Sequence, residues 1–405
     1  MKSIKLILLL VMSNFCFGQN NQNEIDSLKS IATAEVPVTT KLSAYAKLIP
    51  LLTDSSEVNS ILDQSFLLVE GNKYRQRFLL QLSQVAVQLR KQDEVMKRNF
   101  LLKTLREKLS DSDSTYTVAE IMYESGAVNH RIGKLDQALL HFSNSEEHFA
   151  SINDQYGQAK CLAASSIISW SLGDWEDSFE PCKKSIVLFE SQGKMSDAII
   201  MRYNLCDMYM KVGEVSKAIH ELEIGKELAE RTGDARMLIL MLSKLGSIYN
   251  NQGKFELARE YLEKSLSIGL RINQKAAIAE AYISLGDNAL GLKANHLAVS
   301  YYQKSLKIYE ETGDLLGATK RLFSLGNYYL KNNQLDSGMF YFNKGFEICD
   351  KAKFRNEHLH QLGVLGDLFL NKGELPIALN YFFEGLQIAE QVPDPISMSR
   401  FHLEI

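Results

Sequence analysis

Proline is scarce in this sequence: only 6 of the 405 residues are proline. Globular proteins contain about 5% proline on average, and a low content favours long helices over many short strands and turns. The remaining composition is that of a globular protein, with 45% hydrophobic and 23% charged residues. Length alone would allow two or three domains of ordinary size.

The sequence also lacks an excess of basic residues. Its net charge is −4 at neutral pH. The segment 1–18 holds two lysines and no acidic residue, so its loss would lower the net charge by two, to −6. A protein that binds nucleic acid needs a concentrated basic face. We therefore expect no nucleic-acid partner.

Long apolar runs and paired cysteines are absent after residue 18. No run of about 20 apolar residues occurs there, so we expect no membrane-spanning helix. Cys161, Cys182, Cys206 and Cys349 occur singly and without C-x-x-C pairs, which argues against a zinc site and against a dense disulfide framework. Cys182 and Cys206 could approach each other between neighbouring helices, and we interpret them as buried free thiols rather than a disulfide.

The motifs of common catalytic sites are missing as well. There is no P-loop, no G-x-G-x-x-G at a strand-to-helix turn and no G-x-S-x-G elbow. The eight histidines are dispersed. The closest pair, His358 and His360, would point to different faces of a helix. We therefore predict a protein that is not an enzyme and that has no cofactor and no metal site.

Residues 1–18 resemble a secretory signal peptide. Two lysines open an almost unbroken apolar run from Ile4 to Met12, and the small residues Cys16 and Gly18 occupy the positions that a signal peptidase reads. The run is too short to span a membrane comfortably as an uncleaved anchor. A lipoprotein is disfavoured because Phe15, rather than a small residue, precedes Cys16. We predict cleavage after Gly18 and a periplasmic or secreted protein.

Three columns of residues recur every 40 positions. The first is a turn residue followed five positions later by a small residue: Gly133, Gly173, Gly213, Gly253, Lys293, Asn333 and Gly373. The second consists of small residues: Gly126, Ser166, Cys206, Gly246, Gly286, Gly326 and Gly366. The third consists mainly of large apolar residues: Phe142, Cys182, Leu222, Leu262, Tyr302, Phe342 and Phe382. Three columns in one register predict seven repeats without an insertion.

Each repeat is predicted to form two amphipathic helices. Within residues 237–271, apolar residues recur at steps of three and four on both sides of a break at Gly253, which is the pattern of two helices joined by a turn. Gly246 and Ala258 are small. We expect the two helices to cross there, because larger side chains would hold the backbones apart.

These repeats resemble the tetratricopeptide repeat, on the pattern Leu242-x-x-Leu245-Gly246-x-x-Tyr249 with Ala258 and Leu262 following. The pattern returns from Leu322 to Tyr329 and, with Phe for Tyr, from Leu362 to Phe369. The family consensus has Trp at the first position, a closing Pro and a period of about 34 residues. This sequence has Leu or Tyr there, no closing Pro and a period of 40 positions, like the long-repeat branch of the family.

The resemblance covers residues 115–392 and implies an all-α, right-handed α-solenoid. The pattern decays in residues 40–114, where we predict two degenerate helix pairs at 40–70 and 73–109, giving about nine antiparallel pairs in total. Residues 19–39 are predicted to be a flexible or capping lead-in. Residues 393–405 align with the start of a further helix, either cut short by the end of the chain or serving as a short natural cap.

The resemblance also implies a ligand groove lined by the first helix of each pair. We predict that it is formed by residues directly after the small crossing residue and one helical turn later: Asp207, Ser247, Asn250, Asp287, Asn327, Asp367, His130 and Trp170. Asn can pair with peptide groups and Asp with a basic side chain, so the expected ligand is a protein or a somewhat basic peptide. At any single position, the alternative is an ordinary solvated or helix-supporting side chain.

Two functions are compatible with this sequence. The first is a non-enzymatic, exported scaffold that binds a protein or peptide. The alternative is the extracytoplasmic sensor portion of a longer signal-transduction protein, tethered to the membrane. A signal peptide followed by long tetratricopeptide units resembles the input region of bacterial sensors that end in a histidine kinase or a helix-turn-helix regulator. That resemblance concerns architecture only, since no residue here carries signalling chemistry.

Overall fold

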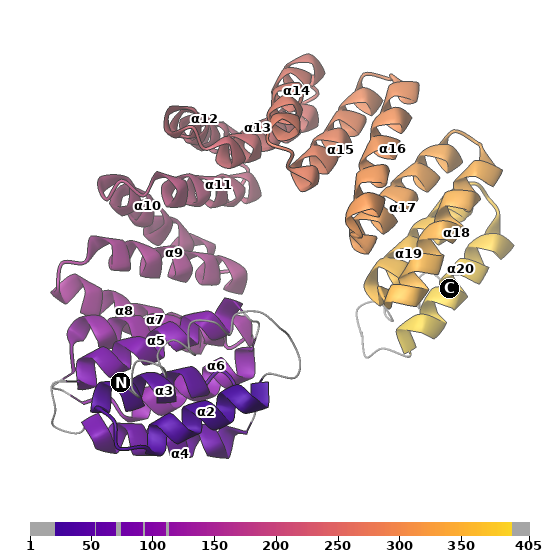
Figure 1. Cartoon of the computed structure of the whole chain (residues 1–405). Helices are drawn as coiled ribbons and strands as arrows, with labels where there is room; N and C mark the ends of the chain where they lie inside the picture. Colours follow the sequence, from indigo (N-terminus) through magenta and orange to yellow (C-terminus); the bar gives the residue numbers. More distant parts are fainter. Residues whose placement is uncertain (1–20, 53, 70–73, 92–93, 111–112, 391–405) are drawn as a thin grey trace. The chain divides into compact units, whose positions relative to one another are not determined.

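The computed structural model describes residues 21–52, 54–69, 74–91, 94–110 and 113–390. The regular structure of these residues is entirely helical and consists of the nineteen helices α2 to α20 (Figure 1). They form two compact units, which divide between Ala218 and Ile219 inside α12. The predicted signal peptide and the predicted final half-helix at 393–405 lie outside the described residues. The prediction of an all-α repeat array is confirmed.

Five helices precede the regular repeats: α2 (Asn21–Thr33), α3 (Val38–Leu48), α4 (Ser55–Val69), α5 (Arg75–Lys91) and α6 (Val95–Glu107). The segments predicted as degenerate pairs, 40–70 and 73–109, contain α3 with α4 and α5 with α6, but α3 packs mainly against α2. Most of the predicted lead-in forms α2. Its Leu28, Ile31 and Ala32 are buried in one apolar core with residues of α3 to α6, so α2 covers the end of this core.

The seven regular units each consist of two successive helices, and their first helices begin 40 positions apart. The first helices are α7 (Thr115–Arg131), α9 (Gln155–Leu172), α11 (Met195–Lys211), α13 (Ala235–Asn251), α15 (Lys275–Gly291), α17 (Leu315–Lys331) and α19 (Arg355–Asn371). The second helices are α8 (Leu135–Ser151), α10 (Trp175–Ser191), α12 (Val215–Thr232), α14 (Phe255–Arg271), α16 (Asn295–Thr312), α18 (Leu335–Ala352) and α20 (Leu375–Glu390).

The small residues of the second column allow the two helices of a unit to pack closely. All seven are buried, and so are all seven residues of the third column. A Cβ atom placed on Gly326 would lie 2.6 Å from the ring of Phe342, and one placed on Gly246 would lie 2.6 Å from Leu262. In the units with glycine in the second column, the large third-column side chain therefore fills the space that a glycine side chain would need.

The turns between the paired helices use one backbone conformation throughout. The turn residue has a positive φ in every unit, including Lys293 and Asn333, where φ is +58° although the residue is not glycine. A left-handed backbone brings the Cβ of an ordinary residue close to the following carbonyl oxygen. The array keeps this geometry even where glycine is absent, so the turn conformation is imposed by the packing of the helices that it joins.

The close crossing predicts the effect of Gly326→Ala. In an open helix this change stabilises by about 1 kcal/mol, but here the new methyl group would overlap the Phe342 ring, and overpacking costs about 1–3 kcal/mol. We expect a lower free energy of unfolding, measured by urea denaturation of the whole chain. The double variant Gly326→Ala/Phe342→Leu should recover part of the loss. A Gly326→Ala protein as stable as the wild type would contradict this account of the crossing.

Candidate peptide-binding groove

All eight predicted groove residues lie on first helices and have side chains that are at least partly exposed. Five of them lie in the second of the two compact units, which begins at Ile219. They are Ser247 and Asn250 on α13, Asp287 on α15, Asn327 on α17 and Asp367 on α19. In the other unit they are His130 on α7, Trp170 on α9 and Asp207 on α11. The residue one place before the Asp, Asn and Ser column is buried in every repeat. Exposure thus changes within one residue step, as expected for one accessible face on each first helix.

Asn250 is tied into the packing of adjacent repeats. Its Nδ2 donates to the carbonyl oxygen of Ser284 at 3.2 Å, and its Oδ1 accepts a hydrogen bond from Nδ2 of the buried Asn288 at 2.7 Å. Asn288 also donates to the carbonyl oxygen of Phe255 at 2.7 Å. The two amides join α13 to α15, so Asn250 has a supporting role in addition to any contact with a ligand.

Sequence reasoning missed Asn288, although a signal was present. The equivalent positions of other repeats are mostly apolar, namely Val128, Ile168, Met208, Ile248 and Leu368. A polar residue in an apolar column needs a hydrogen-bonding partner when it is buried. Asn250, which is 38 positions earlier on the preceding first helix, was the available partner.

Asp287 belongs to a polar cluster between α15, α16 and α17. The hydroxyl of Tyr302 donates to its Oδ1 at 2.5 Å. Burial of the carboxyl raises the pKa of Asp287 above its ordinary value, although the Tyr302 hydrogen bond and the nearby Arg321 favour the ionised form. On the same helix, Glu280 Oε1 accepts a hydrogen bond from Tyr309 at 2.5 Å. Two carboxylates are thus held in place by tyrosine hydroxyls.

Arg321 is the unusual member of this cluster. The equivalent residues of five other first helices are apolar and buried, namely Ile121, Cys161, Met201, Met241 and Ala281, and the sixth is the buried but uncharged Gln361. The Nε atom of Arg321 and the Oγ atom of Ser305 are both buried without a hydrogen-bond partner among the described residues. The cluster has more acidic than basic groups, so this part of the first helices is suited to a positively charged ligand.

The groove residues of the other unit lie near aromatic rings and lysines. The rings of Trp170 and Trp175 are 5.9 Å apart, and Lys211 Nζ lies 5.8 Å from the Trp175 ring. On α9, Lys160 pairs with Glu120 at 3.1 Å and lies 4.6 Å from the centre of the Tyr123 ring. Burial alone would lower the pKa of Lys160, but Glu120 more than offsets this and the pKa is raised. The basic groups here are thus engaged with partners of this chain.

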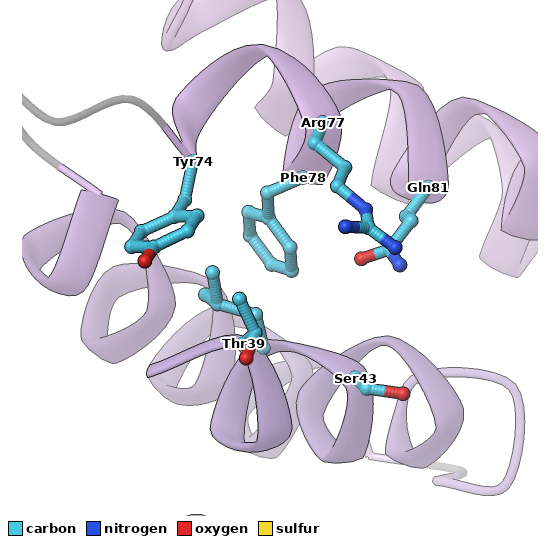
Figure 2. Close-up of a pocket in the computed structure, with 7 residues that line it drawn as sticks. Thr39, Ser43, Tyr74, Arg77, Phe78 and Gln81 are labelled. Atoms are coloured by element: carbon cyan, nitrogen blue, oxygen red, sulfur yellow. The ribbon is translucent and has the colours of Figure 1, made fainter. Parts of the chain in front are cut away.

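A cavity lies between α3 and α5. Figure 2 shows the Phe78 ring extending from α5 toward Thr39 on α3, with Arg77 and Gln81 beside it. The cavity measures about 110 Å³, whereas pockets that hold drug-sized ligands measure about 300–1,000 Å³. It is too small to receive a peptide segment.

The cysteines and the possible metal ligands were also located in the described part of the chain. Cys161, Cys182, Cys206 and Cys349 are buried and are not assigned to a disulfide. No group of three His, Cys, Asp or Glu side chains is arranged to hold a metal ion in the residues that the structure covers. No helix within those residues has the length and apolar character needed to cross a membrane.

Comparison with known proteins gives the family of the repeats. The model of the tetratricopeptide repeat matches residues 237–311, which cover α14, α15 and most of α13 and α16. Residues 237–311 thus match tetratricopeptide repeats, and the other units of the array share their helix pairing and their period. One curated relative of this tetratricopeptide chain is the response regulator aspartate phosphatase A of Bacillus subtilis (strain 168), 23% identical over 136 residues. That match spans 32% of this chain and 35% of the relative, about a third of its length.

Solved structures with a similar tetratricopeptide fold match most of the chain. The apo form of the quorum sensor NprR from B. thuringiensis has a TM-score of 0.61 at 15% identity and covers 91% of this chain and 99% of its own. Aspartyl phosphate phosphatase F from Bacillus subtilis has a TM-score of 0.55 at 13% identity, covering 96% and 97%. A Rap protein complexed with competence and sporulation factor has a TM-score of 0.51 at 16% identity, covering 88% and 98%. At these identities the likeness shows the fold.

Proposed function

We propose that this protein is a non-enzymatic scaffold that binds an extended, somewhat basic segment of a partner along the first helices of its tetratricopeptide array. The observation that carries the proposal is the accessible row of acidic and amide side chains on successive first helices. Its central member, Asp287, is oriented by the hydroxyl of Tyr302 at 2.5 Å. A carboxylate that is already oriented loses little side-chain entropy when it pairs with a ligand.

The residue types in this row match the groups of an extended peptide. A peptide offers backbone N–H and C=O groups along its length, and the amide of Asn327 can pair with both kinds. The carboxylates of Asp287 and Asp367 can pair with basic side chains of the ligand. Charge-assisted hydrogen bonds of this kind are about twice as strong as neutral ones, so the acidic positions should favour basic sequences.

Solved structures of similar fold support a peptide or protein ligand. One holds a Rap protein together with competence and sporulation factor, and another is of a quorum sensor. The match to this chain extends over nearly the whole length of both, at 98% and 99%. A scaffold of this fold can therefore serve in recognition, while the identity of the ligand for this chain depends on its own groove residues.

The binding proposal can be tested by selecting random nine-residue peptides, displayed on phage, against the whole chain. We expect enrichment of peptides with Lys or Arg. Asp287→Asn should weaken the enriched peptides at least about tenfold, because loss of a charged hydrogen-bonding partner costs roughly 1.5–3 kcal/mol. Fluorescence anisotropy with labelled peptides would measure this change.

The matched control is Asp136→Asn, which removes one exposed carboxylate from the second helix α8 and should leave the affinity unchanged. Selection that enriches no sequence would contradict the binding proposal. Equal losses in Asp136→Asn and Asp287→Asn would show that only the net charge matters and would contradict the proposed groove.

Catalysis is not part of the proposal, although two of the similar proteins are named as phosphatases. The sequence match to one of them covers 35% of its length. We predict that the purified chain does not accelerate hydrolysis of the phosphorylated aspartate in a response regulator that has been treated with acetyl phosphate. Release of inorganic phosphate would be measured with and without the chain. Faster release of phosphate in the presence of a substoichiometric amount of the chain would show that the protein is an enzyme and would contradict the proposal of a non-enzymatic scaffold.

Export from the cytoplasm is proposed from the sequence of residues 1–18. We expect the native protein to begin at Gln19, as determined by mass spectrometry, and an antibody to detect it outside the cytoplasm at the size of this chain from Gln19 onward. A much larger band in the inner membrane would favour the alternative, in which this array is the sensor portion of a signal-transduction protein. A cytoplasmic protein that retains Met1 would contradict both.

A further inference from the structure

Three pairs of tyrosine rings are stacked in the unit that begins at Ile219. Their centroid distances are 5.5, 5.9 and 5.5 Å, and their planes differ by 24°, 27° and 1°, for Tyr249–Tyr261, Tyr282–Tyr301 and Tyr329–Tyr341 respectively. Stacked rings present negative π faces that attract cations. Such a pair can therefore bind a positively charged side chain.

Two of the three pairs are occupied by lysines of this chain. Lys226 Nζ lies 5.7 Å from the centre of the Tyr261 ring, and Lys254 Nζ lies 5.7 Å from the Tyr249 ring. Lys304 Nζ lies 5.4 Å from Tyr282 and 5.5 Å from Tyr301. In the part of the chain that the structure describes, no Lys or Arg lies over the rings of Tyr329 or Tyr341. The third pair lacks the cation that the other two have.

A depression of about 360 Å³ lies beside the third pair, between α17 and α18. It is lined by Tyr329, Asp336, Ser337, Phe340 and Tyr341. Phe340 is 52% exposed and lies edge-on to Tyr341, at 5.4 Å between ring centres. Lys344 lies over the Phe340 ring at 4.6 Å, so a cation already contacts this cluster, although not at the stacked pair.

Asp336 gives the depression a negative charge. Its carboxylate is exposed and forms no ion pair with any residue that the structure describes. An apolar partner placed here would take water from this carboxylate without replacing its hydrogen bonds, which is unfavourable. A cationic partner would satisfy it and contact the rings at the same time. The charge and the aromatic faces therefore favour the same kind of occupant.

The depression is separate from the proposed groove. Asn327, a groove residue, and Tyr329 are two positions apart on α17. Side chains two positions apart on a helix do not face the same side. A ligand on the first-helix face and a side chain bound at Tyr329 would therefore occupy different surfaces of this unit.

We propose that this depression, which we name the α17–α18 aromatic pocket, binds an arginine side chain of a partner protein. Arginine suits it better than lysine, because a planar guanidinium group can stack on a tyrosine ring while two of its N–H groups pair with one carboxylate. The net charge of −4 on this chain also favours encounter with a basic partner.

The probe for a test is the blocked tripeptide acetyl-Gly-Arg-Gly-amide, added to the full chain. Saturation-transfer difference NMR, with irradiation of the aromatic protons of the protein, reports contact between the rings and the arginine methylene groups. We expect a saturable signal in the millimolar range. The same peptide with citrulline, which has the shape of arginine without its charge, should give at least threefold less signal, as should the peptide with lysine.

Two variants place the signal at the pocket. Asp336→Asn, which changes an exposed side chain in the first turn of α18, should lower the signal at least threefold, and Tyr341→Leu should do the same by removing one ring face. Asp136→Asn is the matched control: it lies at the same repeat position on α8, where the residues matching Tyr329 and Tyr341 are Asn129 and His141. That variant should keep the full signal.

Other outcomes would overturn the proposal. Equal signals from the arginine and citrulline peptides would show that no cation is recognised. An unchanged signal in Asp336→Asn would place the contact elsewhere, and a loss in Asp287→Asn but not in Asp336→Asn would assign it to the groove. A lysine peptide that matches arginine would reject the guanidinium geometry. Because Asp287 and Asp336 are tested separately, the pocket and the groove can fail independently.

Discussion

The close crossing of the two helices in each unit is the constraint on which the rest of this array depends. One helix contributes a residue with little or no side chain, and the other contributes a large side chain that covers it, as Phe342 covers Gly326. This contact fixes the distance between the helices and their rotation about their own axes. The rotation then determines which residues of the first helix are exposed, so the accessible row next to the small column follows from the crossing.

Much of this arrangement could be predicted from spacing alone. A strict period along the chain places equivalent residues in equivalent surroundings, so the crossing residues, the turns and the helix pairs could be assigned without coordinates. The turn column was identified mainly by glycine, yet Lys293 and Asn333 share its positive φ. Register was therefore a better guide to backbone conformation than residue type.

The polar contacts between helices could not be derived in the same way. Asp287 was identified as an accessible residue, but its hydrogen bond to Tyr302 depends on the reach of a long side chain across a helix pair. Asn250 was assigned to the groove, whereas its amide also joins two repeats through Asn288. Such contacts depart from the repeat, because each occurs in one unit where the column changes character. Asn288, in a column that is apolar in most other repeats, is the clearest example.

In the compact unit that begins at Ile219, the charged groups of the first-helix face and those at the stacked tyrosines are held by different interactions. On the first-helix face, tyrosine hydroxyls orient the carboxylates of Asp287 and Glu280. At the stacked tyrosines, the π faces of the rings attract lysines. Tyrosine contributes its hydroxyl to the first arrangement and its ring to the second, so one residue type supports both surfaces.

The uniform turn geometry has a consequence for how such a chain can change its length. Each 40-residue repeat, counted from one turn residue to the next, begins and ends in the same backbone conformation. Its contacts are with the repeats directly before and after it. Duplicating or deleting one whole repeat would therefore preserve the turns on either side of it. A change of any other length would bring the wrong residues to the crossing. The number of units is thus free to vary, while the size of a unit is not.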